Sequence, residues 1–235
     1  MADVPAFRWA DHGAVLFDLD GVITPTAEVH ERAWAELFAD FDYTPTDYLR
    51  HIDGKPRYDG VAAFLASRGQ SLPWGTPNDP PGADTVCGMG NAKNDVFAAI
   101  LAAEPMAPYP GTIATMDLLD GLGRPQAIVS SSRNARMVLE SAGLLDRFNV
   151  IVDGMVAAER GLPGKPDPAT FIYAAALLGV DVSTTVVVED AVSGVAAGVA
   201  GGFGFVLGVD RGNNASPLRE AGAHLVVEDL AETLD

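Results

Sequence analysis

The sequence has few cysteines and few basic residues, and it lacks any long apolar run. A single cysteine, Cys87, excludes an internal disulfide and suits a reducing compartment. No uninterrupted apolar stretch approaches the length of a membrane span. The opening residues, MADVPAFRWADHG, contain no apolar core of a secretory signal. These absences predict a soluble cytoplasmic protein.

The shortage of basic residues constrains the partners. Fifteen Lys and Arg residues stand against thirty-two Asp and Glu residues, which gives a net charge of −17. Such an excess argues against nucleic acid or an anionic membrane as a partner. It also repels an anionic substrate at long range, so a phosphate ester would require a metal ion and a few well-placed cations. The 235 residues suffice for one large domain or two modest ones.

What the sequence does contain begins with a short apolar run that leads into paired acids. Residues 14–17 (AVLF) predict a buried strand, and Asp18, Asp20 and Gly21 follow it. Side chains two residues apart on a strand point to the same face, so both aspartates can enter one pocket while Gly21 allows a sharp turn. Such a pair suits Mg²⁺ binding or attack on phosphorus. A solvated Asp-Gly turn is the alternative.

The same pattern recurs late in the chain. Residues 186–188 predict a second buried strand, followed by Glu189, Asp190 and a turn of small residues. Adjacent residues on a strand face opposite ways, so we expect at most one of these acids to contact a metal ion directly. The other would act through water.

Polar residues also follow a strand in the middle of the chain. Residues 127–129 predict a strand that ends at Ser130, whose hydroxyl would either hold phosphate or serve as an ordinary helix cap. Lys165 lies between a glycine and a proline, just before a helix that begins near Pro168. A lysine fixed in this way suits a point charge directed at a phosphate.

The alternation of strands and helices predicts the fold. Further strands are expected at 149–152, 204–209 and 224–227, with helices at 109–123, 136–142 and 196–201. Strands joined by helical crossovers form a doubly wound parallel sheet of the α/β class.

Residues 42–108 differ because they contain no buried-strand run. Helices are expected at 58–67 and 93–103, with a long Pro/Gly-rich loop at 72–86, and a helix at 28–39 with Thr26 as its N-cap precedes them. We therefore expect a small helical domain inserted after the first strand. Lys93 would stand at a helix start, where a bound anion would offset its unfavourable charge, unless it is simply solvated.

These residues together resemble the haloacid dehalogenase superfamily of phosphotransferases. Its four motifs occur in order: DLDGV at 18–22, Ser130, Lys165, and EDAVSG at 189–194. The resemblance implies a Rossmann-like core of residues 1–27 and 108–235 and a helical cap domain of residues 28–107. Within the superfamily the chain is similar to the β-phosphoglucomutases, in FDLDGVITPTAEVHERAW, in the cap residues Gly54, Arg57 and Lys93-Asn94, and in YPG, SSSRN and GKPDP. Pro25 and the long 72–86 loop depart from that pattern.

The resemblance implies roles for the acidic residues. Asp18 would attack the phosphoryl group and Asp20 would serve as general acid and base. Mg²⁺ would be held by the carboxylates of Asp18 and Asp190, by the backbone carbonyl of Asp20, and by Glu189 through water.

It also implies roles for the basic and polar residues. Lys165 and Ser130 would offset charge on the transferring phosphoryl group. Ser131 would contact the substrate, and Asn134 would hold phosphate or orient Lys165. Arg57, next to Gly54, would hold the distal phosphate of a bisphosphorylated sugar, while His30 and Lys93 would couple cap closure to the position of Asp20.

The expected function is therefore a monomeric hexose-phosphate mutase that interconverts β-glucose 1-phosphate and glucose 6-phosphate. A Mg²⁺-dependent phosphatase acting on a sugar phosphate or another small metabolite is the main alternative. An acidic binding module without catalysis is disfavoured because every motif residue is present. Dehalogenase activity is disfavoured by Asp20.

Overall fold

The fold is built on one parallel sheet of six strands. The computed structural model describes residues 7–104, 106–212 and 214–234, and within them the strand order is β3-β2-β1-β4-β5-β6. The strands are β1 (Ala14–Phe17), β2 (Gln126–Val129), β3 (Val150–Val152), β4 (Thr185–Glu189), β5 (Phe205–Val209) and β6 (Leu225–Val227). All five neighbouring pairs are parallel. Each strand begins and ends within one residue of the predicted range, so the predicted sheet is confirmed.

Helices cover both faces of the sheet. Val15 and Phe17 of β1 point into one apolar cluster and Leu16 into another, as the alternation of a strand requires. The first cluster includes residues of α5 (Pro110–Gly121) and α6 (Ala135–Ser141), and the second includes residues of α8 (Ala169–Leu178), α9 (Val192–Ala200) and α10 (Ala215–Glu220). The sheet is therefore doubly wound. The predictions lacked α7 (Gly154–Arg160) and α10, and they began α9 four residues too late.

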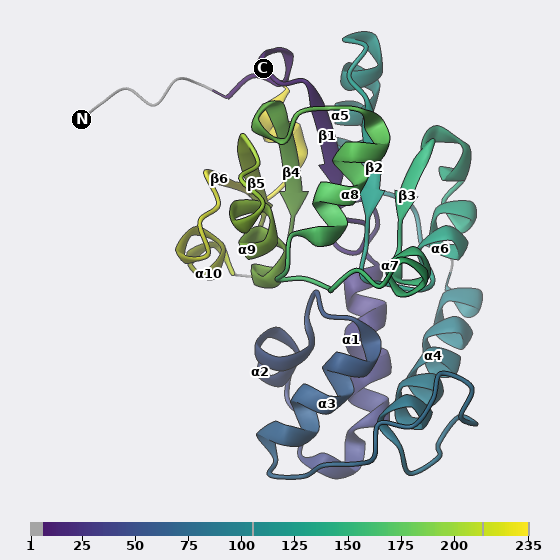
Figure 1. Cartoon of the computed structure of the whole chain (residues 1–235). Helices are drawn as coiled ribbons and strands as arrows, with labels where there is room; N and C mark the ends of the chain where they lie inside the picture. Colours follow the sequence, from purple (N-terminus) through teal and green to yellow (C-terminus); the bar gives the residue numbers. More distant parts are fainter. Residues whose placement is uncertain (1–6, 105, 213, 235) are drawn as a thin grey trace.

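The remaining helices form a separate group, which we call the helical segment (residues 26–103). It contains α1 (Thr26–Leu37), α2 (Pro45–Asp47), α3 (Arg57–Ser67) and α4 (Val86–Ala103). Figure 1 shows these helices together beyond the carboxyl ends of the strands, toward which the arrows of β1 and β4 point. The group has an apolar cluster of its own, in which the Phe38 and Phe64 rings stack with centroids 4.0 Å apart.

Single helical turns complete the chain. They lie at Trp9–Asp11, Ala39–Phe41, Leu145–Arg147, Val182–Thr184 and Leu230–Thr233, with a π-helical turn at Tyr48–Ile52. Residues 70–85 contain neither helix nor strand, so the expected long loop is present. None of the described helices has both the length and the apolar character needed to cross a membrane.

The predicted start of α4 was wrong. The helix begins at Val86, seven residues before Lys93, and Thr85 caps it by accepting a hydrogen bond of 2.9 Å from the Gly88 amide. The sequence obscured this start because glycines at 88 and 90 weaken helix propensity. Gly90 is needed for packing, since a Cβ there would lie 2.7 Å from the Tyr58 ring. Lys93 consequently lies inside the helix and is buried, with 2% of its surface exposed, so it is neither a helix-start cation nor a solvated lysine.

The predicted cap of α1 was also wrong. Pro25 precedes the helix and Thr26 is its first residue, without a side-chain capping bond. The Thr26 hydroxyl instead donates a hydrogen bond of 2.5 Å to Asp20. The residue thus joins the helical segment to the end of β1.

Candidate active site

The paired acids lie at the carboxyl end of β1. Asp18 is buried, Leu19 points into the core, and Asp20 faces the same side as Asp18. Gly21 has a φ of +83°, and a Cβ at this position would lie 1.8 Å from the Asp190 carboxylate. Gly21 therefore permits both the turn and the close approach of Asp190.

A buried lysine joins two strand ends. The Lys165 ammonium lies 2.5 Å from Asp18 Oδ1 and 2.5 Å from Glu189 Oε1, and it donates a third hydrogen bond of 3.0 Å to the carbonyl of Val129. Burial acts to lower the pKa of Lys165, but the two carboxylates outweigh burial and raise it. Lys165 is therefore a fixed positive charge beside Asp18.

Three acids gather around this charge. Asp18, Glu189 and Asp190 each place a carboxylate oxygen within 4.8 Å of the others. Burial raises the pKa of all three, with added repulsion from neighbouring acids, and the pKa of Glu189 reaches about 8. One ammonium does not balance three carboxylates in a buried site. Hard oxygen donors with excess negative charge fit a divalent cation such as Mg²⁺.

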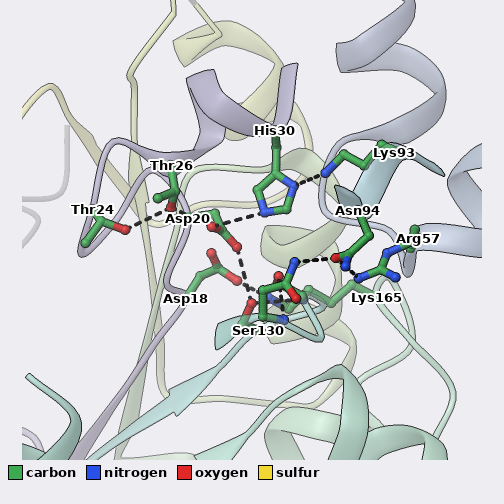
Figure 2. A network of polar contacts seen from close by, with 12 residues as sticks. Asp18, Asp20, Thr24, Thr26, His30, Arg57, Lys93, Asn94, Ser130 and Lys165 are labelled. Carbon is green, nitrogen blue, oxygen red and sulfur yellow. Dashed lines mark hydrogen bonds and ion pairs between the residues drawn. The ribbon is translucent and has the colours of Figure 1, made fainter. Parts of the chain in front are cut away.

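Asp20 belongs to a second network that extends into the helical segment. It accepts hydrogen bonds from Thr26 (2.5 Å) and Ser130 (3.3 Å), and His30 Nε2 lies 3.4 Å from its carboxylate. Lys93 contacts the other ring nitrogen of His30 (Figure 2). Burial alone would raise the pKa of Asp20, but His30 and Thr26 outweigh it and lower the pKa to about 2. His30 therefore lies next to Asp20.

A polar bridge lies on the opposite side of the cavity. Asn94 Oδ1 accepts hydrogen bonds from Arg57 (2.6 Å) and from Asn134 (2.7 Å), so it joins the helical segment to the loop after β2 (Figure 2). Ser131 donates a hydrogen bond of 2.7 Å to the carbonyl of Gly54 across the same gap. The described hydrogen bonds of Lys165 go to Asp18 and to the carbonyl of Val129, whereas the Asn134 amide donates to Asn94.

A cavity of about 60 Å³ lies between the sheet and the helical segment, and of the residues described above its wall contains Asp18, Asp20, Glu189, Asp190, His30, Gly54, Arg57, Lys93 and Ser131. Its wall also contains Asp53, Lys55 and Arg133, none of which the sequence had indicated as a site residue. Arg133 lies within the polar run SSSRN, which was the available signal, but its direction depends on packing. It donates a hydrogen bond of 3.3 Å to the Tyr58 hydroxyl.

A larger hollow of about 630 Å³ adjoins this cavity and shares Arg57, Ser131 and Arg133 with it. Ser130 and Lys165 also border this hollow, and Pro77 brings the 70–85 loop to its wall. Asn91 holds the loop by donating hydrogen bonds to the carbonyls of Pro77 (3.1 Å) and Asp79 (2.9 Å). The long loop thus lies beside the site residues.

Known proteins resemble this chain over most of its length. The family model for haloacid dehalogenase-like hydrolases matches residues 12–202. The chain belongs to this family. It is 44% identical to the β-phosphoglucomutase of Mycobacterium bovis, over 94% of this chain and 91% of that protein.

Two further relatives show the range of the family. The chain is 31% identical to hexitol phosphatase A of Escherichia coli, over 80% of this chain and 78% of that protein. The crystal structure of β-phosphoglucomutase from Clostridium difficile superposes with a TM-score of 0.76 at 26% identity, covering 94% of this chain and 92% of that one. As a haloacid dehalogenase-like protein with such relatives, the chain is a phosphotransferase enzyme.

Proposed function

We propose that this enzyme is a hexose-phosphate mutase of the β-phosphoglucomutase type. It would interconvert β-glucose 1-phosphate and glucose 6-phosphate through an aspartyl-phosphate and a 1,6-bisphosphate. The observation that carries the proposal is that one cavity is lined by Asp18, which Lys165 contacts from behind, and also by the two arginines Arg57 and Arg133. A bisphosphorylated sugar requires cationic groups at both ends, because each end carries a phosphate.

The transfer begins at Asp18. A carboxylate oxygen of Asp18 attacks phosphorus, and the bond from phosphorus to the sugar oxygen breaks. Asp20 gives its proton to the departing oxygen and, in the return step, takes a proton from the attacking hydroxyl. A pKa near 2 favours the ionised form of Asp20, so the proton that Asp20 gives to a departing oxygen must be one that it has taken from an attacking hydroxyl in the preceding step.

Charge on the phosphoryl group is offset by groups around it. Lys165 is held beside Asp18 by three contacts, and Ser130 adds a hydroxyl at the end of β2. Mg²⁺ would be held by Asp18 and Asp190, with the backbone carbonyl of Asp20 and with Glu189 through water, and would supply further charge stabilisation. These residues offer the oxygen donors that Mg²⁺ prefers.

The helical segment would act as a cap, with a domain boundary near residues 28 and 107. His30 and Lys93 both belong to the helical segment. His30 contacts Asp20, and Lys93 contacts His30. Closure therefore positions Asp20 and restricts water, which would otherwise hydrolyse the aspartyl-phosphate. Arg57 and Ser131, with Asn134 through Asn94, would hold the distal phosphate when the cap is closed.

The alternative is a sugar-phosphate phosphatase with the same core. The similarity to hexitol phosphatase A favours it as the second candidate. The two functions share Asp18, Asp20 and Lys165, so these residues do not discriminate between them.

A single assay separates the two. Purified protein with Mg²⁺, β-glucose 1-phosphate and a trace of the 1,6-bisphosphate is followed for glucose 6-phosphate and for inorganic phosphate, with Asp18→Asn as the inactive control. We expect glucose 6-phosphate to form well ahead of free phosphate. Free phosphate alone would make the enzyme a phosphatase. If neither glucose 6-phosphate nor free phosphate forms, the proposed sugar is wrong.

A further inference from the structure

The site cavity contains one acid that the family motifs do not explain. Asp53 belongs to the helical segment, directly after the π-helical turn Tyr48–Ile52, yet its side chain borders the same cavity as Asp18, Glu189 and Asp190. An extra carboxylate is unfavourable for an anionic substrate. Its presence therefore requires a physical reason.

The backbone at Asp53 is held close to the sheet side of the site. Ser193, in the first turn of α9, donates a hydrogen bond of 3.2 Å to the carbonyl of Asp53. Gly54 has a φ of +69°, and a Cβ there would lie 2.1 Å from Ser193 Oγ and 3.0 Å from Ala191 Cβ. Asp53 is thus pressed against the residues that directly follow Asp190.

This placement brings like charges together. Asp53, Asp18, Glu189 and Asp190 all line the same cavity of about 60 Å³. The Lys165 ammonium contacts Asp18 and Glu189. In the described part of the chain, neither Asp53 nor Asp190 forms an ion pair.

We propose that Asp53 couples occupancy of the divalent-cation site to closure of the helical segment. The inference rests on the cation site of the proposed function. Without a cation, closure moves Asp53 toward three carboxylates that share one ammonium, so closure is opposed. With a divalent cation at Asp18 and Asp190, the net charge of the three carboxylates and Lys165 rises from −2 to 0, so the repulsion is removed and the nearby cation attracts the carboxylate of Asp53.

Asp53 acts through its charge and not as a member of the ligand set. The three acids whose oxygens lie within 4.8 Å of one another do not include it. The effect must be reciprocal: a cation that favours the closed form is itself bound more tightly by that form. Asp53 is therefore a positioning residue for the helical segment, and it would allow closure only over a loaded site.

The experiment measures cation binding and closure without measuring turnover. Mg²⁺ affinity is determined by calorimetry, and amide hydrogen exchange of peptides covering residues 52–57 is recorded with and without Mg²⁺. The variants are Asp53→Asn, Asp53→Glu, which keeps the charge, and Asp40→Asn, which removes an exposed acid elsewhere in the helical segment. Thermal unfolding of each variant checks the fold.

We expect Mg²⁺ to slow exchange at 52–57 in the unaltered protein, in Asp53→Glu and in Asp40→Asn. Asp53→Asn should bind Mg²⁺ about tenfold more weakly than the unaltered protein. This factor is at the low end of the losses in metal affinity that follow mutation of residues surrounding the metal ligands. Its exchange at 52–57 should no longer depend on Mg²⁺.

The inference is wrong if Asp53→Asn and Asp40→Asn have the same Mg²⁺ affinity and the same Mg²⁺-dependent change in amide exchange. Absence of Mg²⁺ binding in the unaltered protein would overturn the cation site as well. If only the role of Asp53 is wrong, the protein still forms product in the mutase assay. Failure of the Asp53 inference is therefore distinguishable from failure of the proposed function.

Discussion

Under the proposed function, Arg57 is the residue expected to distinguish a mutase from a phosphatase. The Arg57 guanidinium donates a hydrogen bond to Asn94, which also accepts one from the Asn134 amide. The guanidinium is therefore oriented before any ligand binds. A mutase must hold the phosphate that is not being transferred, because the sugar bisphosphate binds in one orientation for the first half-reaction and in the reverse orientation for the second. A phosphatase needs no such grip on a simple substrate.

Replacement of Arg57 by alanine should therefore affect the two reactions unequally. A lost hydrogen bond to a charged group is worth about 1.5–3 kcal/mol, which corresponds to a fall of roughly 10- to 100-fold in kcat/KM for the mutase reaction. Hydrolysis of an aryl phosphate should change much less, because that substrate has no distal phosphate. Steady-state kinetics on both substrates measure the ratio.

Arg160→Ala, at an exposed arginine near the end of α7, is the matched control for removal of a positive charge. Equal losses on both substrates for Arg57→Ala would remove the case for a distal-phosphate anchor.

At this scale the sequence indicated one class of site residue and missed another. Asp18 and Ser130 directly follow buried strands, and Glu189 ends one with Asp190 next to it. Because parallel strands end at one edge of the sheet, the proximity of these residues was predictable. Asp53 and Arg133 lie in loops instead. Their direction depends on how the helical segment packs, and no local pattern reports that.

At the scale of elements, the helical segment has an apolar cluster of its own in addition to the cluster that α1 and α4 share with the sheet. Phe38 is fully buried there and stacks on Phe64 with ring centroids 4.0 Å apart. Truncation of a buried phenylalanine typically costs about 3–5 kcal/mol. Phe38→Ala should destabilise the helical segment by that amount in a urea titration followed by fluorescence and circular dichroism.

The shape of the transition tests the proposed domain boundary. Leu49→Ala, at a half-exposed leucine of the same segment, is the control and should be nearly neutral. If residues 28–107 form a domain, Phe38→Ala should shift an early transition and leave a later one for the sheet unchanged. A single transition that shifts as a whole would mean that the two cores unfold together.

Element prediction succeeded where burial is continuous and failed where it is not. The six strands were placed within one residue because apolar runs of three to five residues stand out between polar turns. α7 begins with a glycine and α10 contains a proline, and both residue types favour turns and loops in a sequence, so these two short helices were missed. The start of α4 was hidden by Gly88 and Gly90, whose small size serves packing instead of helix propensity.

Charge sets the behaviour of the whole molecule. The net charge of −17 opposes a phosphorylated sugar at a distance. The cavity wall contains Lys55, Arg57, Lys93 and Arg133, with Lys165 behind it, and these cations act only at short range. The net negative charge of the protein therefore repels a phosphorylated substrate at long range, and the cations of the cavity attract it only at short range.

Added salt should consequently speed capture of the substrate. The screening length falls from about 30 Å at 0.01 M salt to about 8 Å at 0.15 M, so the repulsion from the distant acids is lost while the contacts inside the closed cavity persist. We expect kcat/KM for a sugar phosphate to rise about threefold over this range, a modest effect beside the 10- to 10³-fold changes known for strongly steered association. Initial rates at saturating Mg²⁺ in sodium and in potassium chloride would measure it, since an effect of ionic strength is the same for both salts. A fall in kcat/KM would mean that the cations of the cavity dominate the field from the outset, and that the acidic surface has no part in substrate capture.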